Sequence, residues 1–473
     1  MTISARARIT AVLFALGFAL SLSLARVVPF NARTFLFDYH AFACAGAVAG
    51  TRDDPYRAEP LRSCEHRRIA FRADQANLAV PAPLPGYALA PFSLLGRLPV
   101  PLGAALWLAF SLVGALIAGF ALVRLSRLEA PIVWAVLALP LLAPVVLGQL
   151  VPVALGALCL CALALERGKY ALAAACAWIA MIEPHVALPA CLALAIFVPR
   201  TRMALGIGAA VAALLVFALL GIGVDLEYLA SVLGAHAASE LTNEEQYGIA
   251  YYLHAIGAGD RAALLLADAW YVLMAALGTI AAHRLVLRGA PRALYALLPA
   301  ALAVVGAPFL HIAQVAFALP AALVLCGRVW PSARAPRLAL AALALPWGAF
   351  PALVAAAPLA AVAFGSVVSG ALRARPLAAT IAGLAAGSFI FELSLHLTAR
   401  PDAAAALSGF RNGRLLAEAS WGAYIQNGFH SNVALFMTAK VPTYLGLGLL
   451  LWLSARAVLA RTLPGSAAPR SGR

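Results

Sequence analysis

The sequence predicts an all-α, polytopic membrane protein. Hydrophobic residues make up 64% and charged residues 11% of the 473 residues, and the mean hydropathy is +0.92. A chain of this composition has the hydrocarbon of a bilayer, and not water, as its main solvent. Apolar runs recur to the C-terminus and are separated by short breaks that carry arginine. The lipid bilayer is therefore its first predicted partner.

The first apolar run, residues 11–30, follows Arg6 and Arg8 and resembles a secretory signal sequence. Similar runs follow it and no Ala-x-Ala-like site ends it, so we predict a retained helix. The later apolar segments are 102–123, 132–147, 151–165, 170–182, 186–198, 204–224, 262–282, 293–309, 312–325, 338–372, 377–397 and 441–459. Because several are shorter than a full span, we expect roughly 12 to 14 transmembrane helices.

The net charge of +15 does not indicate a nucleic-acid partner, because no basic run with interleaved aromatic residues is present. Most arginines lie in the short breaks between apolar segments, where the only acids are Glu129 and Glu166. The positive-inside rule places these breaks in the cytoplasm. We therefore predict a multi-pass protein of a bacterial inner (plasma) membrane, with both termini cytoplasmic.

A single integral-membrane domain is predicted over residues 1–473. Alternation of the spans places three longer segments on the extracytoplasmic face, namely 31–82, 225–261 and 399–440. Prolines at segment ends, such as Pro140 and Pro184, predict stopped or kinked helices. Such breaks are tolerated at membrane depth only beside protein or a wet cavity. We expect a cavity that opens outward, with the outer loops forming an extracytoplasmic active site.

The cysteines leave one question open. Cys44 and Cys64 share the first outer segment, where they can form a disulfide in an oxidising compartment or stay as two free thiols. The other five lie in apolar segments and are expected to pack as small hydrophobic side chains. No Cys and His spacing indicates a metal site, and no cofactor is predicted. We interpret Asp53 and Asp54, which precede Pro55, as a turn and not as a cation site.

Asp38 is the most informative single residue. It lies a few residues beyond the first apolar segment, at the start of the first outer segment. A carboxylate at a membrane surface can act as a base on a substrate that the lipid delivers. The structural alternative is that Asp38 caps a helix beginning at Tyr39, since Asp is a favoured N-cap residue.

Short motifs follow Asp38 in a fixed order. They are the FLFDYHAFACAGAVAGTRDDPY run of residues 35–56, Gly148-Gln149, Ile182-Glu183-Pro184 and APFLH at residues 307–311. This order resembles the polyprenol-phosphate-mannose-dependent α-mannosyltransferases of glycosyltransferase family 87, which have a GT-C fold. The chain departs from that pattern at Glu183, where lysine is usual, and at Gln314, where an aspartate commonly follows the histidine.

The resemblance implies an inverting glycosyltransferase that moves a hexose, expected to be mannose, from a polyprenyl-phosphate donor to a glycolipid or glycan acceptor. Asp38 is implied to be the general base. A single carboxylate suffices for inversion from a lipid phosphate, unlike the pair of a glycoside hydrolase. His311 is the expected phosphate contact, with Glu183, Gln149 and Gln314 also in the substrate site.

An arginine of the first outer segment is also expected to hold the leaving phosphate, because guanidinium matches its oxygens in a bidentate way. We name Arg52, although the sequence does not choose among the candidates and most are expected to be solvated. The arginines of this segment are Arg33, Arg52, Arg57, Arg62, Arg67, Arg68 and Arg72. The aromatic and amide residues of 421–432 suit either sugar stacking or an interfacial belt.

Other interpretations stay open. His311 can be a histidine hydrogen-bonded to backbone at a helix start, and Glu183 can be a paired structural acid. A secondary transporter or lipid flippase would use Glu183, Glu392 and His396 as a polar pathway, although no internal repeat is visible. Glu392 and His396 are also spaced to bond each other. A catalytically inactive relative is the third possibility.

Overall fold

The computed structural model describes residues 35–71, 73–243, 246–344, 403–428 and 433–459. Within these ranges all regular elements are helices, and β-pairing is limited to one isolated bridge between Arg57 and Leu416. The prediction of a helical membrane protein is therefore confirmed. The predicted segments 11–30 and 377–397, with Glu392 and His396, lie outside the described residues.

The first half of the described chain contains α2 (Phe37–Gly50), α3 (Ala58–Glu65), η1 (Ala73–Gln75), α4 (Gly86–Leu95), α5 (Val100–Ser126), α6 (Ala130–Leu147), α7 (Val151–Glu166), α8 (Tyr170–Ala180), α9 (Pro184–Phe197), η2 (Pro199–Thr201) and α10 (Arg202–Leu219). The second half contains α11 (Gly223–Glu227), η3 (Tyr228–Val232), α12 (Leu233–Ser239), α13 (Ile249–Ala255), α14 (Asp260–Leu287), α15 (Leu294–Gly306), η4 (Ile312–Ala318), α16 (Leu319–Val324), η5 (Leu325–Val329), α17 (Arg334–Ala344), α21 (Ala403–Leu407), α22 (Ala417–Gly428) and α23 (Val433–Leu459).

The predicted count of 12 to 14 spans is not confirmed. Five helical stretches in the described part are long and apolar enough to cross a membrane, or six if the bent α6 counts as one span. They are Val100–Ser126, Pro199–Leu219, Asp260–Leu287, Ile312–Val329 and Lys440–Leu459. The segments 151–165, 170–182, 186–198 and 293–309 do form helices, but each of these helices is too short to qualify. Their apolar runs are real, yet about 20 residues are needed to cross hydrocarbon.

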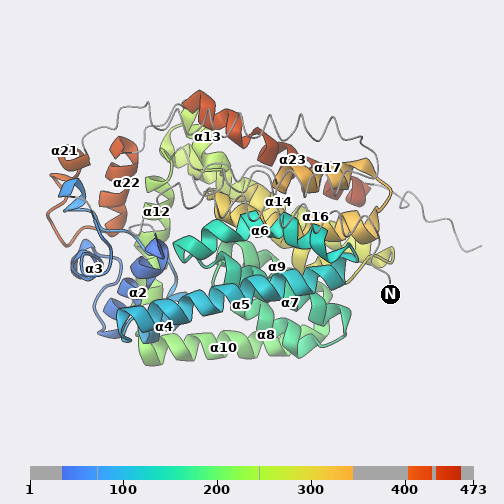
Figure 1. Cartoon of the computed structure of the whole chain (residues 1–473), viewed down its shortest axis with the longest axis horizontal. Coiled ribbons are helices and arrows are strands. Elements are labelled where there is room, and N and C mark those ends of the chain that lie inside the picture. Colours follow the sequence, from blue (N-terminus) through green and yellow to red (C-terminus); the bar gives the residue numbers. More distant parts are fainter. Residues whose placement is uncertain (1–34, 72, 244–245, 345–402, 429–432, 460–473) are drawn as a thin grey trace, which may run out of the picture.

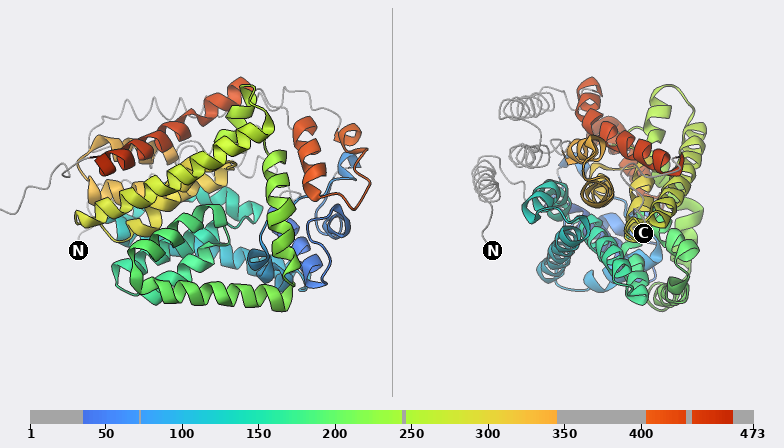
Figure 2. Two further views of the ribbon diagram at one scale, coloured as in Figure 1. Left: turned by 180° about the vertical axis from the view of Figure 1, so that it is seen from behind. Right: turned by 90° about the vertical axis from the view of Figure 1, so that its right-hand side faces the viewer.

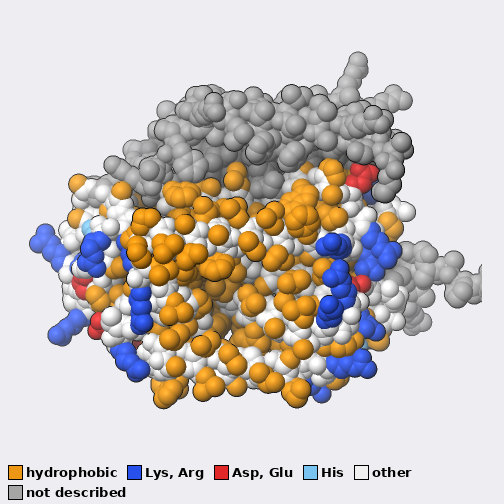
Figure 3. Space-filling model, turned by 60° about the horizontal axis from the view of Figure 1, so that its bottom comes forward, with side chains coloured by type: hydrophobic (Ala, Val, Ile, Leu, Met, Phe, Trp, Pro, Cys, Tyr) orange, Lys and Arg blue, Asp and Glu red, His pale blue; other side chains and the backbone are white. Residues whose placement is uncertain are grey.

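The long helices lie side by side, and several short helices gather at one end of them. Figures 1 and 2 show α5, α10, α14 and α23 running along the long axis, with α2, α3, α12, α21 and α22 together at one end. We call these five helices the cap. Viewed as in Figure 3, the surface is a broad apolar band with Lys and Arg side chains gathered at its two ends. An apolar band between charged ends is the pattern of a protein that lies across a bilayer.

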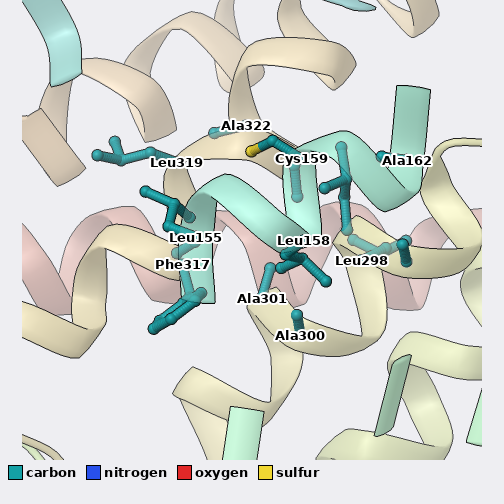
Figure 4. Close-up of a cluster of buried hydrophobic side chains, with 14 of the residues drawn as sticks. Leu155, Leu158, Cys159, Ala162, Leu298, Ala300, Ala301, Phe317, Leu319 and Ala322 are labelled. Carbon is teal, nitrogen blue, oxygen red and sulfur yellow. The ribbon is translucent and has the colours of Figure 1, made fainter. Parts of the chain in front are cut away.

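The core of the bundle is made by short helices that the long ones surround. Almost every residue of α15 is buried, and α15 packs on α7, α9 and α14. Figure 4 shows small and branched side chains of α7, α15 and α16 that pack against one another, among them Leu158, Ala301 and Ala322. Small residues allow helix backbones to approach closely inside a membrane protein.

The cap is held by covalent and polar links between segments far apart in the chain. Cys44 of α2 and Cys64 of α3 form a disulfide, which answers the question that the sequence left open. The N–H of Ala58 donates to the Leu415 carbonyl at 2.7 Å, which ties α3 to the segment before α22. Arg57 pairs with Glu227 at 2.7 Å. The predicted outer segment 31–82 is thus largely folded.

Candidate active site

Polar residues meet where the cap joins the bundle. The starts of α2, α9 and η4 lie there together with the end of α6, and all four carry a residue that the sequence singled out. These residues are Asp38, Glu183, His311 and Gln149. Gln149 hydrogen-bonds Asp38, and Gln314 links His311 to Glu183.

Asp38 is the second residue of α2, which begins at Phe37, two residues earlier than the capping alternative assumed. Leu36 is the N-cap residue, its backbone lies in the left-handed region at φ 54°, and no side chain caps the helix. The N–H of Leu36 donates instead to the carbonyl of Val146 at 2.7 Å, at the end of α6. The alternative that Asp38 caps a helix beginning at Tyr39 is therefore wrong. Asp38 is left available for another role.

Gly148 and Gln149, which directly follow α6, contact the start of α2. Gly148 has a φ of 75°, and a Cβ there would lie 2.6 Å from the Cβ of Tyr39, so only glycine fits. The indole N–H of Trp107 donates to the Gly148 carbonyl at 2.8 Å and fixes the turn. The side chain of Gln149 hydrogen-bonds the Asp38 carboxylate. The Gln149 side-chain oxygen is buried and has no hydrogen-bond partner among the described residues.

Burial sets the basicity of Asp38. It raises the pKa of this carboxyl from 3.8 to about 6, while the hydrogen bond from Gln149 and the nearby charge of His311 act in the opposite direction. The net effect is a carboxylate that is ionised at neutral pH yet takes up a proton far more readily than a solvated aspartate. These are the properties of a general base. The influence of His311 on this pKa indicates that its ring lies near Asp38.

His311 is both a helix start and part of a polar network. Its N–H donates to the side-chain oxygen of Gln314 at 3.0 Å, at the beginning of η4. Its ring nitrogen Nε2 lies 3.1 Å from the amide nitrogen of Gln246 and 3.7 Å from Oε2 of Glu240. His311 therefore lies at a helix start, as the structural interpretation expected. The imidazole ring, about one-third exposed, stays available to a substrate.

Glu183 meets Gln314 directly. Glu183 lies between α8 and α9, outside the candidate spans. The Gln314 amide donates to its Oε2 at 3.3 Å, and Nδ1 of His185 lies 3.8 Å from the same oxygen. Burial raises the pKa of Glu183 to about 8 although the bond from Gln314 lowers it, so the side chain is mostly a neutral acid at pH 7. The two positions that depart from the family pattern are thus partners in one hydrogen bond.

Glu240 is a central residue that the sequence did not single out. It is 2% exposed and accepts hydrogen bonds from Asn243 at 2.6 Å, Gln246 at 2.6 Å and Trp421 at 2.9 Å. Burial alone would raise its pKa, but His311, His236 and these bonds lower it. The signal was the dense run of acids and amides after α12, which sequence alone reads as a solvated loop.

Trp421 connects the outer C-terminal segment to this network. Its indole N–H binds Glu240, so this residue has a defined partner and is not only part of an aromatic belt. His430 and Asn432, from the same predicted group, lie outside the described residues.

Arg52 is not brought into the site. It follows the opposite end of the 14-residue helix α2, which is about 20 Å from Asp38 by helix geometry. It is exposed, and one of its guanidinium nitrogens approaches Gly221. The described residues contain no group of three or more His, Cys, Asp and Glu side chains placed to hold a metal ion.

Comparison with known proteins identifies no relative. No family model, no curated protein and no solved structure matches the chain. The site has to be interpreted from its own geometry.

Proposed function

We propose that the protein is an integral-membrane, GT-C-like glycosyltransferase. It would move a hexose, with mannose the first choice by the family 87 resemblance, from a polyprenyl-phosphate donor to a hydroxyl of a glycolipid or glycan, with inversion. The observation that carries the proposal is Asp38, a carboxylate held by Gln149 beside His311 and given a pKa of about 6 by burial. A base with that pKa suits deprotonation near neutral pH.

The reaction would proceed in one displacement. Asp38 takes the proton of the acceptor hydroxyl as its oxygen attacks the anomeric carbon, and the lipid phosphate leaves from the opposite face of the sugar. The imidazole of His311 would donate a hydrogen bond to a phosphate oxygen. The amide of Gln149 orients the base, and its unpartnered oxygen is free to accept from a sugar hydroxyl.

Glu183 has a role that differs from that of the usual lysine. A charged carboxylate would repel a phosphate, but burial keeps Glu183 mostly protonated at neutral pH. A neutral carboxyl can donate to an anionic oxygen while Gln314 holds its other oxygen. The Glu183 and Gln314 pair is thus compatible with a phosphate-bearing donor.

The proposed topology has the cap and the site extracytoplasmic and both termini cytoplasmic. The distribution of arginines between apolar segments supports this orientation. The disulfide between Cys44 and Cys64 supports it independently, because disulfides persist in oxidising compartments. The proposed GT-C architecture of roughly 12 to 14 helices would include the segments outside the described residues.

The decisive experiment measures transfer of radiolabelled mannose from polyprenyl-phosphate-mannose by the full chain in proteoliposomes. Asp38→Asn keeps the shape of the side chain and its bond to Gln149 but removes the base, so turnover should fall by about 10²–10⁴-fold. Asp53→Asn is the matched control, because Asp53 is exposed on the same segment and accepts a hydrogen bond from the hydroxyl of Thr51. It should retain full activity.

Unchanged transfer by a folded Asp38→Asn variant would show that Asp38 is not the general base. Absence of transfer by the wild-type chain with every polyprenyl-phosphate sugar tried, together with solute or lipid flux across the vesicle, would favour the transporter or flippase. Absence of both would favour the inactive relative.

A further inference from the structure

A second polar cluster includes the two residues of α2 that follow Asp38. It consists of Tyr39, His40 and Arg68, and each has a buried nitrogen or oxygen without a hydrogen-bond partner among the described residues. These atoms are the phenol oxygen of Tyr39, Nδ1 of His40 and Nη1 of Arg68. All three groups can donate a hydrogen bond. Nothing in the proposed transfer reaction uses them.

Arg68 and Tyr39 meet near the end of α4, and His40 lies beside Tyr39. Nη2 of Arg68 donates to the carbonyl of Gly96 at 2.8 Å. The phenol oxygen of Tyr39 lies against Gly103, the fourth residue of α5, close to the carbonyl of Leu95. The rings of Tyr39 and His40 have centroids 5.3 Å apart. Leu95 and Gly96 are neighbours in the chain, so Tyr39 and Arg68 reach the same small region.

The region carries a positive charge that no acid balances. Arg68 forms no ion pair with a described carboxylate, in contrast to Arg57 and Arg62. Its contact with Gly96 is an ordinary cap of a helix end, but that contact occupies only one of the five N–H groups of a guanidinium. Burial lowers the pKa of Arg68, which means that the charge is costly without an anion. Buried polar atoms are rarely left unpaired.

An apolar surface leads away from this cluster along α5. Leu106, Phe110 and Val113 follow Gly103 on the same side of the helix, as helical spacing requires, and they are 37%, 52% and 52% exposed. α5 is one of the candidate spans, so this stripe faces hydrocarbon. A cluster of buried hydrogen-bond donors beside an apolar stripe matches a lipid with an anionic head.

We propose that Arg68, Tyr39 and His40 bind the phosphate group of a membrane lipid whose hydrocarbon chain lies along the exposed face of α5. The guanidinium takes two phosphate oxygens, and the phenol and imidazole donate to the others. Among the seven arginines of the first outer segment, this geometry selects Arg68. The inference concerns side chains that the proposed reaction does not use, and it does not depend on sugar transfer.

The test uses the full chain, purified in detergent and stripped of lipid. Native mass spectrometry counts bound phosphatidylglycerol, and thermal unfolding measures the stabilisation that it gives. Diacylglycerol with the same chains lacks the phosphate, and glycerol 3-phosphate lacks the chains. Phosphatidylglycerol should bind and stabilise, and the other two should do neither at the same concentration.

Arg68→Gln should weaken phosphatidylglycerol binding by about tenfold or more, because a charge-assisted bidentate contact is lost. Arg67→Gln is the matched control, since Arg67 is the exposed neighbour of the same charge, and it should bind like the wild type. Tyr39→Phe keeps the ring beside Trp107 and should weaken binding by about fivefold. The Tyr39→Phe variant tests the site if Arg68→Gln does not fold.

Equal losses in the Arg67 and Arg68 variants would show diffuse surface attraction and would overturn the site. Binding of diacylglycerol as tight as that of phosphatidylglycerol would show that the chains alone are recognised, which also overturns it. Stabilisation by glycerol 3-phosphate equal to that by the lipid would replace the lipid site with a site for a soluble phosphate.

Discussion

The bundle core and the candidate site are stabilised in opposite ways. In the core, α7 and α15 bury mainly Ala, Leu, Val and Gly, and close packing is their main contribution. Their polar side chains, Glu166 and Tyr295, lie at helix ends and are hydrogen-bonded. At the site, Asp38 and Glu183 are carboxyls that burial makes harder to ionise. The fold therefore spends stability at the site in order to hold groups with unusual protonation behaviour.

This difference has a consequence for mutation. In the core almost any change in volume should destabilise the protein, because neighbouring atoms are already in contact. At the site a neutral side chain of the same shape should stabilise the protein while it removes chemistry, which is the usual trade between stability and activity. Three substitutions test the comparison, in order of decreasing effect.

Gly156→Val should have the largest effect on stability. A Cβ on Gly156 of α7 would overlap the carbonyl oxygen of Gly114 on α5, and a Cβ on Gly114 would overlap the carbonyl oxygen of Pro152. Two backbones in contact cannot absorb a branched side chain without separating the helices, so we expect a loss of more than about 3 kcal/mol. The yield of folded protein and the thermal unfolding of the detergent-solubilised chain measure it.

Gly206→Val is the matched control for this packing. Gly206 lies on α10, where nothing is within 4 Å of the position of an added Cβ. The variant should unfold at the wild-type temperature or slightly above it, because valine reduces the backbone freedom of the unfolded chain. Equal destabilisation at both positions would mean that helix propensity, and not the contact between α5 and α7, decides the effect.

Asp38→Asn should stabilise the fold although it abolishes transfer. The pKa of Asp38 is about 6 in the fold against 3.8 for a free side chain, so folding disfavours its ionised form and its contribution to stability is lost as pH rises through about 6. Asparagine avoids this cost. The variant should gain about 1–3 kcal/mol above pH 6 and nothing below pH 3.8.

Thermal unfolding at pH 4 and pH 8 separates this prediction from a general effect of removing an acid. Asp53→Asn again serves as the control and should change little at either pH. A destabilised Asp38→Asn variant at pH 8 would show that the carboxylate has a strong partner, and the comparison between core and site would fail.

The sequence predicted the positions of bundle helices well and the start of α2 less well. The segments 102–123 and 151–165 correspond to Val100–Ser126 and Val151–Glu166, because apolar runs between arginines leave little choice of conformation. The start of α2 was placed two residues late. Its position depends on the backbone bond between Leu36 and Val146, which joins segments far apart in the chain and leaves no local signal.

The candidate site was predicted in part for similar reasons. Asp38, Gln149, Glu183, His311 and Gln314 were named from short motifs. In the structure Gln149 hydrogen-bonds Asp38, and Gln314 links His311 to Glu183. Glu240 and Gln246 were missed because an acid in a polar run looks solvated until the fold buries it. Arg52 was named because the sequence does not show that helix α2 carries it away from Asp38.

The smallest expected effect is that of Glu183→Gln, and it separates the two classes of function. Because the pKa of Glu183 is about 8, the wild-type side chain is already mostly neutral at pH 7, and glutamine has nearly the same shape. Transfer at pH 7 should change by less than about twofold, since a neutral donor is kept.

Above pH 8 the Glu183→Gln variant should be more active than the wild type. The wild type should lose activity as Glu183 ionises beside the phosphate, whereas the Glu183→Gln variant should keep it, and initial rates from pH 6 to pH 9 measure the difference. Glu240→Gln is the contrasting control, because Glu240 has a lowered pKa and works as a charged acceptor for three donors, so its neutral variant should be impaired at every pH. A proton-coupled transporter requires the opposite result at Glu183, since a side chain that cannot release its proton would stop transport at all pH values.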